Sequence, residues 1–547
     1  MNVDISIKIG GEAGQGIQTV GDLLAGVCRK AGLYVMGVND FESRIRGGNS
    51  FFQIRICDAP VLAPAKDVHL LVALNSQIYE LGKKDVLDGG LVIMESKESP
   101  ADNVAPVSIT ELANQAGGRV MGNTVAAGAV LGLLGAPFEI FADLLTQRFS
   151  KKSQAIVDNN IAAAKLGYES IKDVKFKWAF DWDKGDVKGA LINGSQAVSL
   201  GALAGDCRFA AFYPMSPATS VMTNLKKYSK NVPIVVEQVE DEIAAVNAII
   251  GASYAGARAM TSTSGGGFSL MVEGLGLAGI TETPIVVVNA QRPGPATGLP
   301  TRTAQPDLQF VIRASQDEFP RFVFAPGTPA EAFRLTAKAF DVSEKYQVPA
   351  IVLTDQYFGD SLFIEEEKLV APDSVETYTV SDSDLDDPKN YKRYTITEDG
   401  VSPRALPCQG EALVMAAGNE HTEDGHISED AENRVKMMDK RLAKIPGMLS
   451  EIESPEGYFE DSETLLVGWG STKGAIKEAI DILRADGMNI GSIHFSEIWP
   501  FPVEGVTTLL ENAARFIMVE QNSSSQLGLL IREQTGLFYS QAILKYD

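Results

Sequence analysis

Short apolar runs and helical patterns alternate along the first third of the chain. Apolar and polar residues alternate over Val3–Ile9, and a helical pattern at Ile17–Ala31 follows a glycine-rich turn. Further strands are expected at Ser50–Ile56, His69–Leu74 and Leu91–Met94. Strands that alternate with helices predict a mostly parallel sheet covered by helices. We therefore expect a first α/β domain over residues 1–180.

The same alternation continues in two later segments. A helix at Gly194–Ala204 opens a second domain, residues 190–365. Its expected strands are Phe209–Phe212, Ile234–Glu237, Ala257–Thr261, Ile285–Asn289, Phe322–Ala325 and Ala350–Leu353. Residues 366–462 are acidic and polar, as in an excursion and linker, and residues 463–547 form a compact unit. Its expected elements are the strands Leu465–Trp469, Ile490–His494 and Phe516–Glu520 and the helix Thr472–Asp486. The fold class is therefore α/β, with three consecutive α/β domains.

Composition and charge exclude several classes of protein. The chain has 547 residues, of which 45% are hydrophobic and 22% charged, the balance of a chain that buries large cores. Its net charge of −23 argues against nucleic acid and anionic membrane surfaces, which attract clustered Lys and Arg. The best candidate for a membrane span, residues 125–138, is too short. The N-terminal residues lack a basic start followed by an apolar run, so we expect a cytoplasmic protein.

The cysteines stand singly, at Cys28, Cys57, Cys207 and Cys408. Without a C-x-x-C pair, this chain is not expected to hold a cysteine-bound zinc ion or an iron–sulfur cluster. We expect four buried free thiols in a reducing compartment.

Polar side chains follow three of the expected strands of the second domain. The loops are residues 213–220, 261–268 and 294–302, and the last of them carries Arg302, a possible clamp for a carboxylate. Because ligands bind at the carboxyl ends of parallel strands, these loops predict a site. The hydroxyls of Ser216, Thr219 and Ser220 could instead cap the next helix.

One glutamate stands out among four acidic residues near Ile234–Glu237. Glu242 begins the segment Ile243–Gly256, which is apolar or small on nearly every side and must be buried. A carboxyl group at the buried start of such a helix is where acid–base chemistry is commonly found. An ordinary charge at a helix N-terminus is the alternative.

Two N-terminal motifs could bind anions. The turn Gly10–Gly16 lies at a strand-to-helix junction, but Ile17 stands where a Walker loop has Lys, so a tight packing turn is at least as probable. The loop Arg44–Asn49 places two guanidinium groups beside glycines. It could bind a phosphate or form a salt-bridged surface loop.

The segment Glu420–His426 has the composition of a metal site. Ser428 would cap a helix that has acidic residues in its first turn and Lys440, Arg441 and Lys444 in its last. A surface loop followed by a capped helix is therefore favoured over a metal site.

Taken together, these motifs resemble the α subunit of the 2-oxoacid:ferredoxin oxidoreductases, in the form with an N-terminal γ domain. The similar segments are GGEAGQGIQTVG, FESRIRGGNS, YPMSPATS, VVEQVEDEIAAVNAIIGASYAGARAMTSTSGGGF, GPATGLPTRTAQPDLQF and GNEHTEDGHISEDAENRVKMMDKRL. They cover essentially the whole chain. The arrangement looks most like the 2-oxoglutarate branch, which forms succinyl-CoA.

The resemblance implies a γ domain, a transketolase-like domain that binds the pyrimidine of thiamine diphosphate, and a transketolase C-terminal-like domain. It implies oxidative decarboxylation of a 2-oxoacid with coenzyme A, in an (αβ)₂ assembly that passes electrons to ferredoxin. The β subunit would hold Mg²⁺, the diphosphate and a [4Fe-4S] cluster, with no metal in this chain.

The resemblance also assigns residues to roles. Glu242 falls where a glutamate hydrogen-bonds N1′ of the pyrimidine, and Ser216 falls where a threonine is more frequent. The implied residues are Glu242 as the catalytic group; Tyr213, Ser216, Thr219 and Arg302 for substrate; Pro214, Glu242, Ser264, Gly265 and Phe268 for the pyrimidine; and Arg44, Arg46 and Asn49 for coenzyme A. Alternatives are the same chemistry on pyruvate, branched-chain or aryl 2-oxoacids, a non-catalytic scaffold subunit, or a nucleotide-binding protein.

Overall fold

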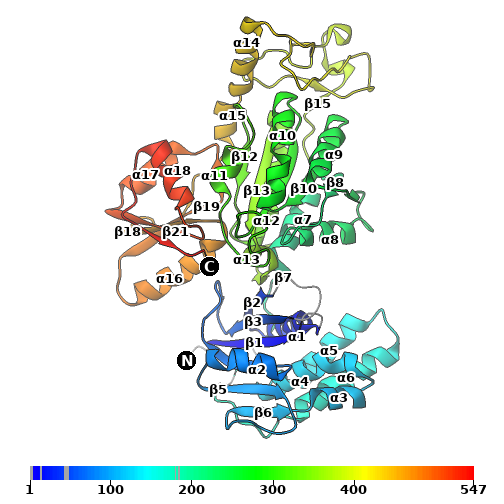
Figure 1. Cartoon of the computed structure of the whole chain (residues 1–547), viewed down its shortest axis with the longest axis vertical. Coiled ribbons are helices and arrows are strands. Elements are labelled where there is room, and N and C mark those ends of the chain that lie inside the picture. Colours follow the sequence, from blue (N-terminus) through cyan, green and yellow to red (C-terminus); the bar gives the residue numbers. More distant parts are fainter. Residues whose placement is uncertain (1–3, 13–14, 42–47, 179, 183–184, 547) are drawn as a thin grey trace. The chain divides into compact units, whose positions relative to one another are not determined.

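The computed structural model describes residues 4–12, 15–41, 48–178, 180–182 and 185–546. The chain divides into two compact units, which we describe separately (Figure 1). Unit 1 comprises residues 1–192 and 360–368, and unit 2 comprises residues 193–359 and 369–547.

Unit 1 is built on an eight-stranded sheet with the order β6-β5-β4-β1-β3-β2-β14-β7. Its strands are β1 (Asp4–Glu12), β2 (Tyr34–Asp40), β3 (Asn49–Cys57), β4 (Val68–Ala73), β5 (Val86–Glu95), β6 (Val104–Val107), β7 (Ala190–Asn193) and β14 (Leu362–Glu365). The prediction of a mostly parallel sheet is wrong here, because β3 runs antiparallel to both β1 and β2. The missed strand β2 is the reason, since its short connection to β3 permits only an antiparallel pair. The strands β1, β4, β5 and β6 form a parallel run.

Helices cover both faces of this sheet. One face packs against α1 (Ile17–Lys30), α4 (Gly122–Leu133), α5 (Phe138–Phe149) and α6 (Gln154–Glu169), and α2 (Ser76–Gly82) covers the other. Helix α4 contains most of the apolar run considered as a membrane span, and glycines let it approach α6 closely. A Cβ on Gly132 would lie 2.5 Å from the carbonyl oxygen of Tyr168. Among the described residues, no helix is long and apolar enough to cross a membrane.

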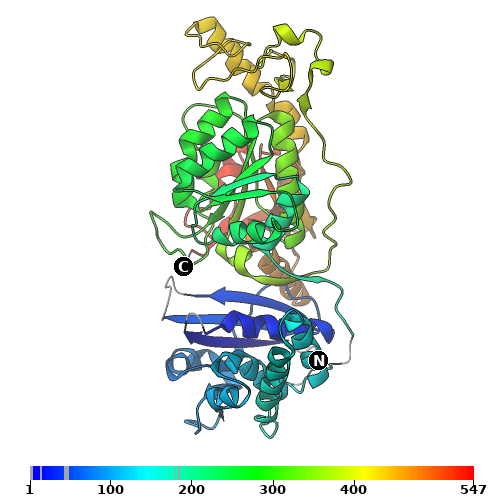
Figure 2. The same ribbon diagram turned by 90° about the vertical axis from the view of Figure 1, so that its right-hand side faces the viewer.

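Unit 2 contains a seven-stranded sheet with the order β20-β12-β13-β11-β10-β8-β9. Its strands are β8 (Phe209–Phe212), β9 (Val235–Gln238), β10 (Ala259–Thr263), β11 (Ile285–Gln291), β12 (Phe322–Phe324), β13 (Pro349–Asp355) and β20 (Glu497–Trp499). All are parallel except β20, as the alternation of strands with helices predicts. Figure 2 shows helices on both sides of this sheet. They are α7 (Gly194–Ala204), α8 (Thr219–Tyr228), α9 (Glu242–Tyr254), α10 (Gly265–Ile280), α11 (Leu308–Ile312), α12 (Pro329–Tyr346) and α13 (Gln356–Asp360).

The C-terminal part of unit 2 adds a five-stranded sheet with the order β17-β19-β18-β21-β22. Its elements are β17 (Glu456–Tyr458), β18 (Thr464–Trp469), α16 (Lys473–Ala485), β19 (Ile490–Phe495), α17 (Val503–Glu511), β21 (Arg515–Glu520), α18 (Gln526–Thr535) and β22 (Gln541–Leu544). One hydrophobic core joins the two sheets: Val287 and Ile351 belong to the same cluster as Val467 and Ile493. The fold class predicted from the sequence, α/β throughout, is confirmed.

The polar excursion is more ordered than a linker. It contains the short strands β15 (Thr379–Val380) and β16 (Arg404–Ala405) and the helices α14 (Ala431–Leu442) and α15 (Ile445–Ser450). The prediction of Ser428 as the helix cap is wrong, because Asp430 accepts the hydrogen bond from the Asn433 N–H at 2.8 Å. The predicted surface loop is also wrong at His421, which is fully buried against Tyr394. Of the four thiols expected to be buried, Cys408 is exposed.

Candidate active site

Four loops gather at one edge of the parallel sheet of unit 2. They follow the neighbouring strands β11, β10, β8 and β9, which lie in this order and run in one direction. The side chains that end these strands therefore share the carboxyl edge, where ligands bind in open α/β sheets. The three loops predicted as a site are brought together, and Glu242 joins them from the loop after β9.

Glu242 is the first residue of α9. Its predecessor Asp241 caps the helix, with its Oδ1 accepting a hydrogen bond from the Ala244 N–H at 2.7 Å. Glu242 is 3% exposed, and its Oε1 atom is sealed from solvent without a hydrogen-bond partner. An unpartnered buried carboxyl oxygen costs free energy, so its retention points to a ligand. One face of α9 is not buried as predicted, since Ile243 is 49% exposed.

The turn from β10 into α10 brings backbone up to this carboxyl group. A Cβ added to Gly267 would lie 2.5 Å from Glu242 Oε1, so only glycine leaves room for the glutamate. Ser264 precedes α10 without capping it, and its Oγ is buried and unpartnered. Phe268 is buried in the first turn and packs edge-on against Phe310, with ring centroids 5.3 Å apart.

Two charged residues in the loop after β11 also belong to the site, and sequence reasoning missed both. Arg292 directly follows β11 and donates from Nη1 to the backbone oxygen of Ser216 at 2.6 Å. Burial lowers the pKa of Arg292, while the nearby carboxylates of Asp307 and Glu242 oppose that shift. Arg292 could have been found from its place at a strand end, by the argument that identified the three loops.

Asp307 is the second missed residue. Its Oδ2 accepts a hydrogen bond from Asn289 Nδ2 at 3.1 Å, and its carboxylate lies against Gly265 at the start of α10. Burial raises the pKa of Asp307 to about 6, against the opposing effects of Asn289 and Arg292. Asn289 has its own buried and unpartnered Oδ1 and lies beside Thr263 in the sheet.

The loop after β8 carries the hydroxyls that could have capped a helix. Helix α8 begins at Thr219 after Ala218, without any side-chain cap, so the capping alternative is wrong. Ser216 is exposed and Tyr213 is 38% exposed, with Pro214 half-buried between them. These side chains therefore remain available at the open side of the site.

Arg302 lies in the same long loop as Arg292. Its side chain is half-buried, and its backbone N–H donates to the Leu299 oxygen at 3.1 Å. Arg292, in this loop, contacts the loop after β8 through the Ser216 backbone oxygen.

In unit 1, the two N-terminal motifs meet at one end of a β-ladder. Asn49 pairs with Glu12 across β1 and β3, and its Oδ1 is buried and unpartnered. Arg44 and Arg46, the other proposed coenzyme A contacts, lie outside the described residues. Gly10 and Gly11 extend β1 rather than forming a turn, and Gly16 at the start of α1 packs tightly, since a Cβ on it would clash with Asn123 Nδ2. This favours the packing interpretation of the turn.

Three parts of the chain match known protein families. Residues 200–440 match the family described as pyruvate flavodoxin/ferredoxin oxidoreductase, thiamine diphosphate-binding. Residues 6–170 match pyruvate ferredoxin/flavodoxin oxidoreductase, and residues 462–546 match core domain II of pyruvate:ferredoxin oxidoreductase.

Full-length relatives carry related names. The 2-oxoacid:ferredoxin oxidoreductase subunit alpha of a Sulfolobus species is 31% identical, with 99% of this chain and 94% of the relative covered. The 2-oxoglutarate oxidoreductase subunit KorA of Mycobacterium tuberculosis is 30% identical, with 91% and 82% covered. The solved 2-oxoglutarate:ferredoxin oxidoreductase of Magnetococcus marinus superposes with a TM-score of 0.90 at 30% identity, covering 100% of this chain and 96% of that one. The resemblance is confirmed: the chain belongs to the 2-oxoacid:ferredoxin oxidoreductases, as an alpha subunit with the family's thiamine diphosphate-binding domain.

Proposed function

We propose that this subunit acts on 2-oxoglutarate, which is oxidatively decarboxylated with coenzyme A to succinyl-CoA and CO₂ while ferredoxin accepts the electrons. Support comes from relatives named for 2-oxoglutarate and from the Magnetococcus marinus structure, which was solved with 2-oxoglutarate, coenzyme A and succinyl-CoA bound. Pyruvate, branched-chain and aryl 2-oxoacids are the alternative substrates.

The residues at the carboxyl edge fit the aminopyrimidine of thiamine diphosphate. The observation that carries this proposal is the sealed, unpartnered Oε1 of Glu242, because a ring nitrogen would complete its hydrogen bonding. Ser264 offers a second unpartnered polar atom, and Gly265, Phe268 and Pro214 supply close backbone and apolar surface. Thiamine diphosphate, when bound, supplies the carbon nucleophile and the electron sink for decarboxylation.

The chain's own groups would hold protons, position substrate and exclude water. Glu242 holds or releases a proton at Oε1 in a site closed by Gly267 and Phe268, where charges act more strongly than in water. We assign the substrate to the exposed side, where Tyr213, Ser216, Thr219 and Arg302 lie. Arg292 joins this set, since its guanidinium already contacts the Ser216 backbone and could hold a carboxylate.

The open side of the site fits a β subunit. Exposed apolar residues border it, namely Ile243 (49%), Leu270 (50%) and Leu299 (54%). The β subunit would bring Mg²⁺, the diphosphate contacts and the [4Fe-4S] cluster, in an (αβ)₂ assembly. In unit 1, we keep Arg44, Arg46 and Asn49 as coenzyme A contacts. The division of the chain into domains over residues 1–180, 190–365 and 463–547, with an excursion over 366–462, stays a prediction.

The test compares Glu242→Gln with Glu240→Gln in the co-expressed αβ complex. Glu240 is exposed two residues before Glu242 and serves as the matched control. We expect Glu242→Gln to abolish viologen reduction that depends on 2-oxoglutarate and coenzyme A, and to weaken thiamine diphosphate binding in calorimetric titrations. Wild-type activity and affinity in Glu242→Gln would contradict the assignment.

The substrate is tested separately with the unmutated complex. A panel of 2-oxoglutarate, pyruvate, branched-chain and aryl 2-oxoacids should give the highest kcat/KM for 2-oxoglutarate. A higher kcat/KM for another 2-oxoacid would show that 2-oxoglutarate is not the preferred substrate, without affecting the proposed role of Glu242.

A further inference from the structure

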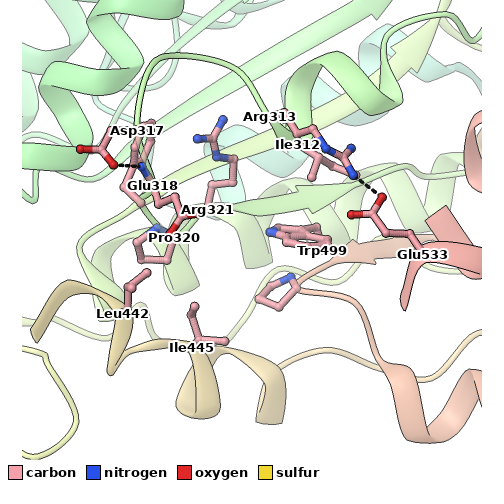
Figure 3. Close-up of a pocket in the computed structure, with 12 residues that line it drawn as sticks. Ile312, Arg313, Asp317, Glu318, Pro320, Arg321, Leu442, Ile445, Trp499 and Glu533 are labelled. Carbon is pink, nitrogen blue, oxygen red and sulfur yellow. Dashed lines mark hydrogen bonds and ion pairs between the residues drawn. The ribbon is translucent and has the colours of Figure 1, made fainter. Parts of the chain in front are cut away.

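A second pocket lies in unit 2, away from the candidate active site (Figure 3). Its volume is about 360 Å³, within the range of small-molecule sites. Arg321 directly precedes β12, and Trp499 ends β20, which is antiparallel to β12. The pocket therefore lies at the amino edge of the parallel sheet, whereas the active-site loops leave its carboxyl edge.

The walls of the pocket are largely apolar. Its apolar residues are Ile312, Phe319, Pro320, Leu442, Ile445, Trp499 and Pro500. Figure 3 shows Leu442 and Ile445 on one side of the pocket, with Pro320 and Trp499 across from them. Such a surface binds the hydrocarbon or ring part of a ligand.

Arg321 brings a positive charge to this pocket, and its guanidinium stacks on the Phe319 ring, 4.2 Å from the centroid. It is 4% exposed, and its Nη1 donates only to the backbone oxygens of Val311 and Ala314. Among the described residues, no carboxylate pairs with it, and burial lowers its pKa to about 10. Buried charges are normally paired, so this guanidinium lacks an anion.

Hydrogen-bond donors remain unused at the same place. Among the described residues, Nε and Nη2 of Arg321 have no hydrogen-bond partner, and Arg321 lines the pocket. Trp499 Nε1 is also without a partner in the described part of the chain, and Figure 3 shows this nitrogen at the edge of the ring nearer to Arg321. Both unused groups are donors, so the missing ligand must accept hydrogen bonds.

The acidic residues at the rim do not fill this role. Glu533 is paired with Arg313, as Figure 3 shows, and Asp317 forms an ion pair with Arg434 at 2.5 Å. Glu318 is exposed rather than directed to a buried charge. The guanidinium of Arg321 is therefore left for a ligand from outside.

We propose that this pocket binds a small organic carboxylate with an apolar or aromatic body. The carboxylate accepts hydrogen bonds from Arg321 and the Trp499 indole, and the body packs against the walls formed by Pro320, Leu442 and Ile445. The site is separate from catalysis and independent of the 2-oxoacid that the enzyme decarboxylates.

The probe is 4-fluorophenylacetate, observed by ¹⁹F NMR line broadening with the full chain and with the αβ complex. We expect saturable binding at least tenfold tighter than that of the neutral 4-fluorophenylacetamide, because the amide lacks the charge that Arg321 requires. Excess 2-oxoglutarate should leave the signal unchanged. Equal affinity for acid and amide, or displacement by 2-oxoglutarate, would overturn the proposal.

Variants distinguish a loss of ligand binding at the pocket from a loss of folding. Arg321→Met should weaken binding at least tenfold, whereas Arg532→Met should not, although Arg532 also stacks on a phenylalanine, 4.3 Å from the Phe538 centroid. Ile445→Trp fills the pocket without touching Arg321, so it keeps the test valid if Arg321→Met fails to fold. Undiminished binding to Ile445→Trp would refute the site.

Discussion

A buried ionic cluster holds the excursion against the rest of unit 2, and Glu282 is its centre. Glu282 is 1% exposed and accepts hydrogen bonds from Lys440 Nζ at 2.7 and 2.8 Å and from Lys444 Nζ at 2.5 Å. Arg393 adds a third cation, bonded to the Glu282 backbone oxygen at 2.7 Å. Burial alone would raise the pKa of Glu282, but Lys444, Lys440 and Arg393 hold it well below its usual range. One carboxylate therefore compensates three cations.

This imbalance predicts an asymmetry between two substitutions. Glu282→Gln leaves the buried cations without their counter-ion, and removing one partner of a buried pair costs about 3–5 kcal/mol of the free energy of unfolding. Lys444→Met leaves Glu282 paired with Lys440 and removes one of three cations that share a single carboxylate. Its cost should be about 1 kcal/mol, as for an average substitution.

The four tryptophans make unfolding of unit 2 separately observable. Trp178 and Trp182 belong to unit 1, whereas Trp469 and Trp499 belong to unit 2. In a Trp178→Phe, Trp182→Phe background, fluorescence during urea unfolding reports on unit 2 alone. The free energy follows from the midpoint, provided that the slope of the transition is unchanged.

An exposed ion pair of the excursion provides the control. Glu411 lies 3.7 Å from Lys389, with both side chains more than 60% exposed, so Glu411→Gln should cost no more than about 1 kcal/mol. The reasoning fails if Glu282→Gln costs no more than Glu411→Gln, or if Lys444→Met is as destabilising as Glu282→Gln. Either result would mean that Glu282 does not neutralise the cluster.

Three other predictions concern the site and the thiols. Gly267→Ala should displace Glu242 and weaken thiamine diphosphate binding at least tenfold in calorimetric titrations, whereas Gly266→Ala, whose nearest neighbour is 3.8 Å away, should not. Asp307 binds its proton more tightly when folded, so the stability it contributes falls as pH rises from about 4 to about 6, and Asp307→Asn should flatten that slope in urea titrations. Cys408 should be the thiol that reacts with Ellman's reagent in the native chain, as peptide mass spectrometry would show, because Cys28, Cys57 and Cys207 are buried. Equal thiamine diphosphate affinities of Gly267→Ala and Gly266→Ala would contradict the first prediction, and an unchanged pH slope in Asp307→Asn would contradict the second. Reaction of Ellman's reagent at a buried cysteine would contradict the third.

Local pattern was enough to predict the parallel strands β8 to β13 of unit 2 and the edge of the sheet at which the candidate site lies, although the short strands β15, β16, β17, β20 and β22 were missed. The runs that open β11 and β13 are apolar, and β8 is apolar throughout, so they indicate strands buried on both faces of a parallel sheet. Once these strands are parallel, the loops that follow them must share an edge, and Ser264 and Glu242 could be assigned to it. That Glu242 Oε1 and Ser264 Oγ are buried without hydrogen-bond partners depends on packing and could be seen only in the structure.

Other features depend on contacts between distant residues. Glu282 and Lys440 are separated by 158 positions, and neither segment alone predicts a buried ion pair. The charges of the excursion therefore indicated a surface, although Lys440 and Lys444 are buried against Glu282. Asp307 was missed for a similar reason, since the path of its loop back to Gly265 cannot be read from composition.

Glu242, the proposed functional carboxyl group, and Glu282, which is bonded within the protein, differ in their hydrogen bonding. Both are almost fully buried, and both lie next to an end of α10, where Gly267 contacts Glu242 and Glu282 follows the last turn. Both oxygens of Glu282 are bonded to lysines, so its burial is compensated within the protein and contributes to folding. Glu242 Oε1 is buried without a hydrogen-bond partner, and the ligand that we propose would recover the cost of that burial. Burial and residue type are the same in the two cases, so the unfilled hydrogen bond is what identifies the site.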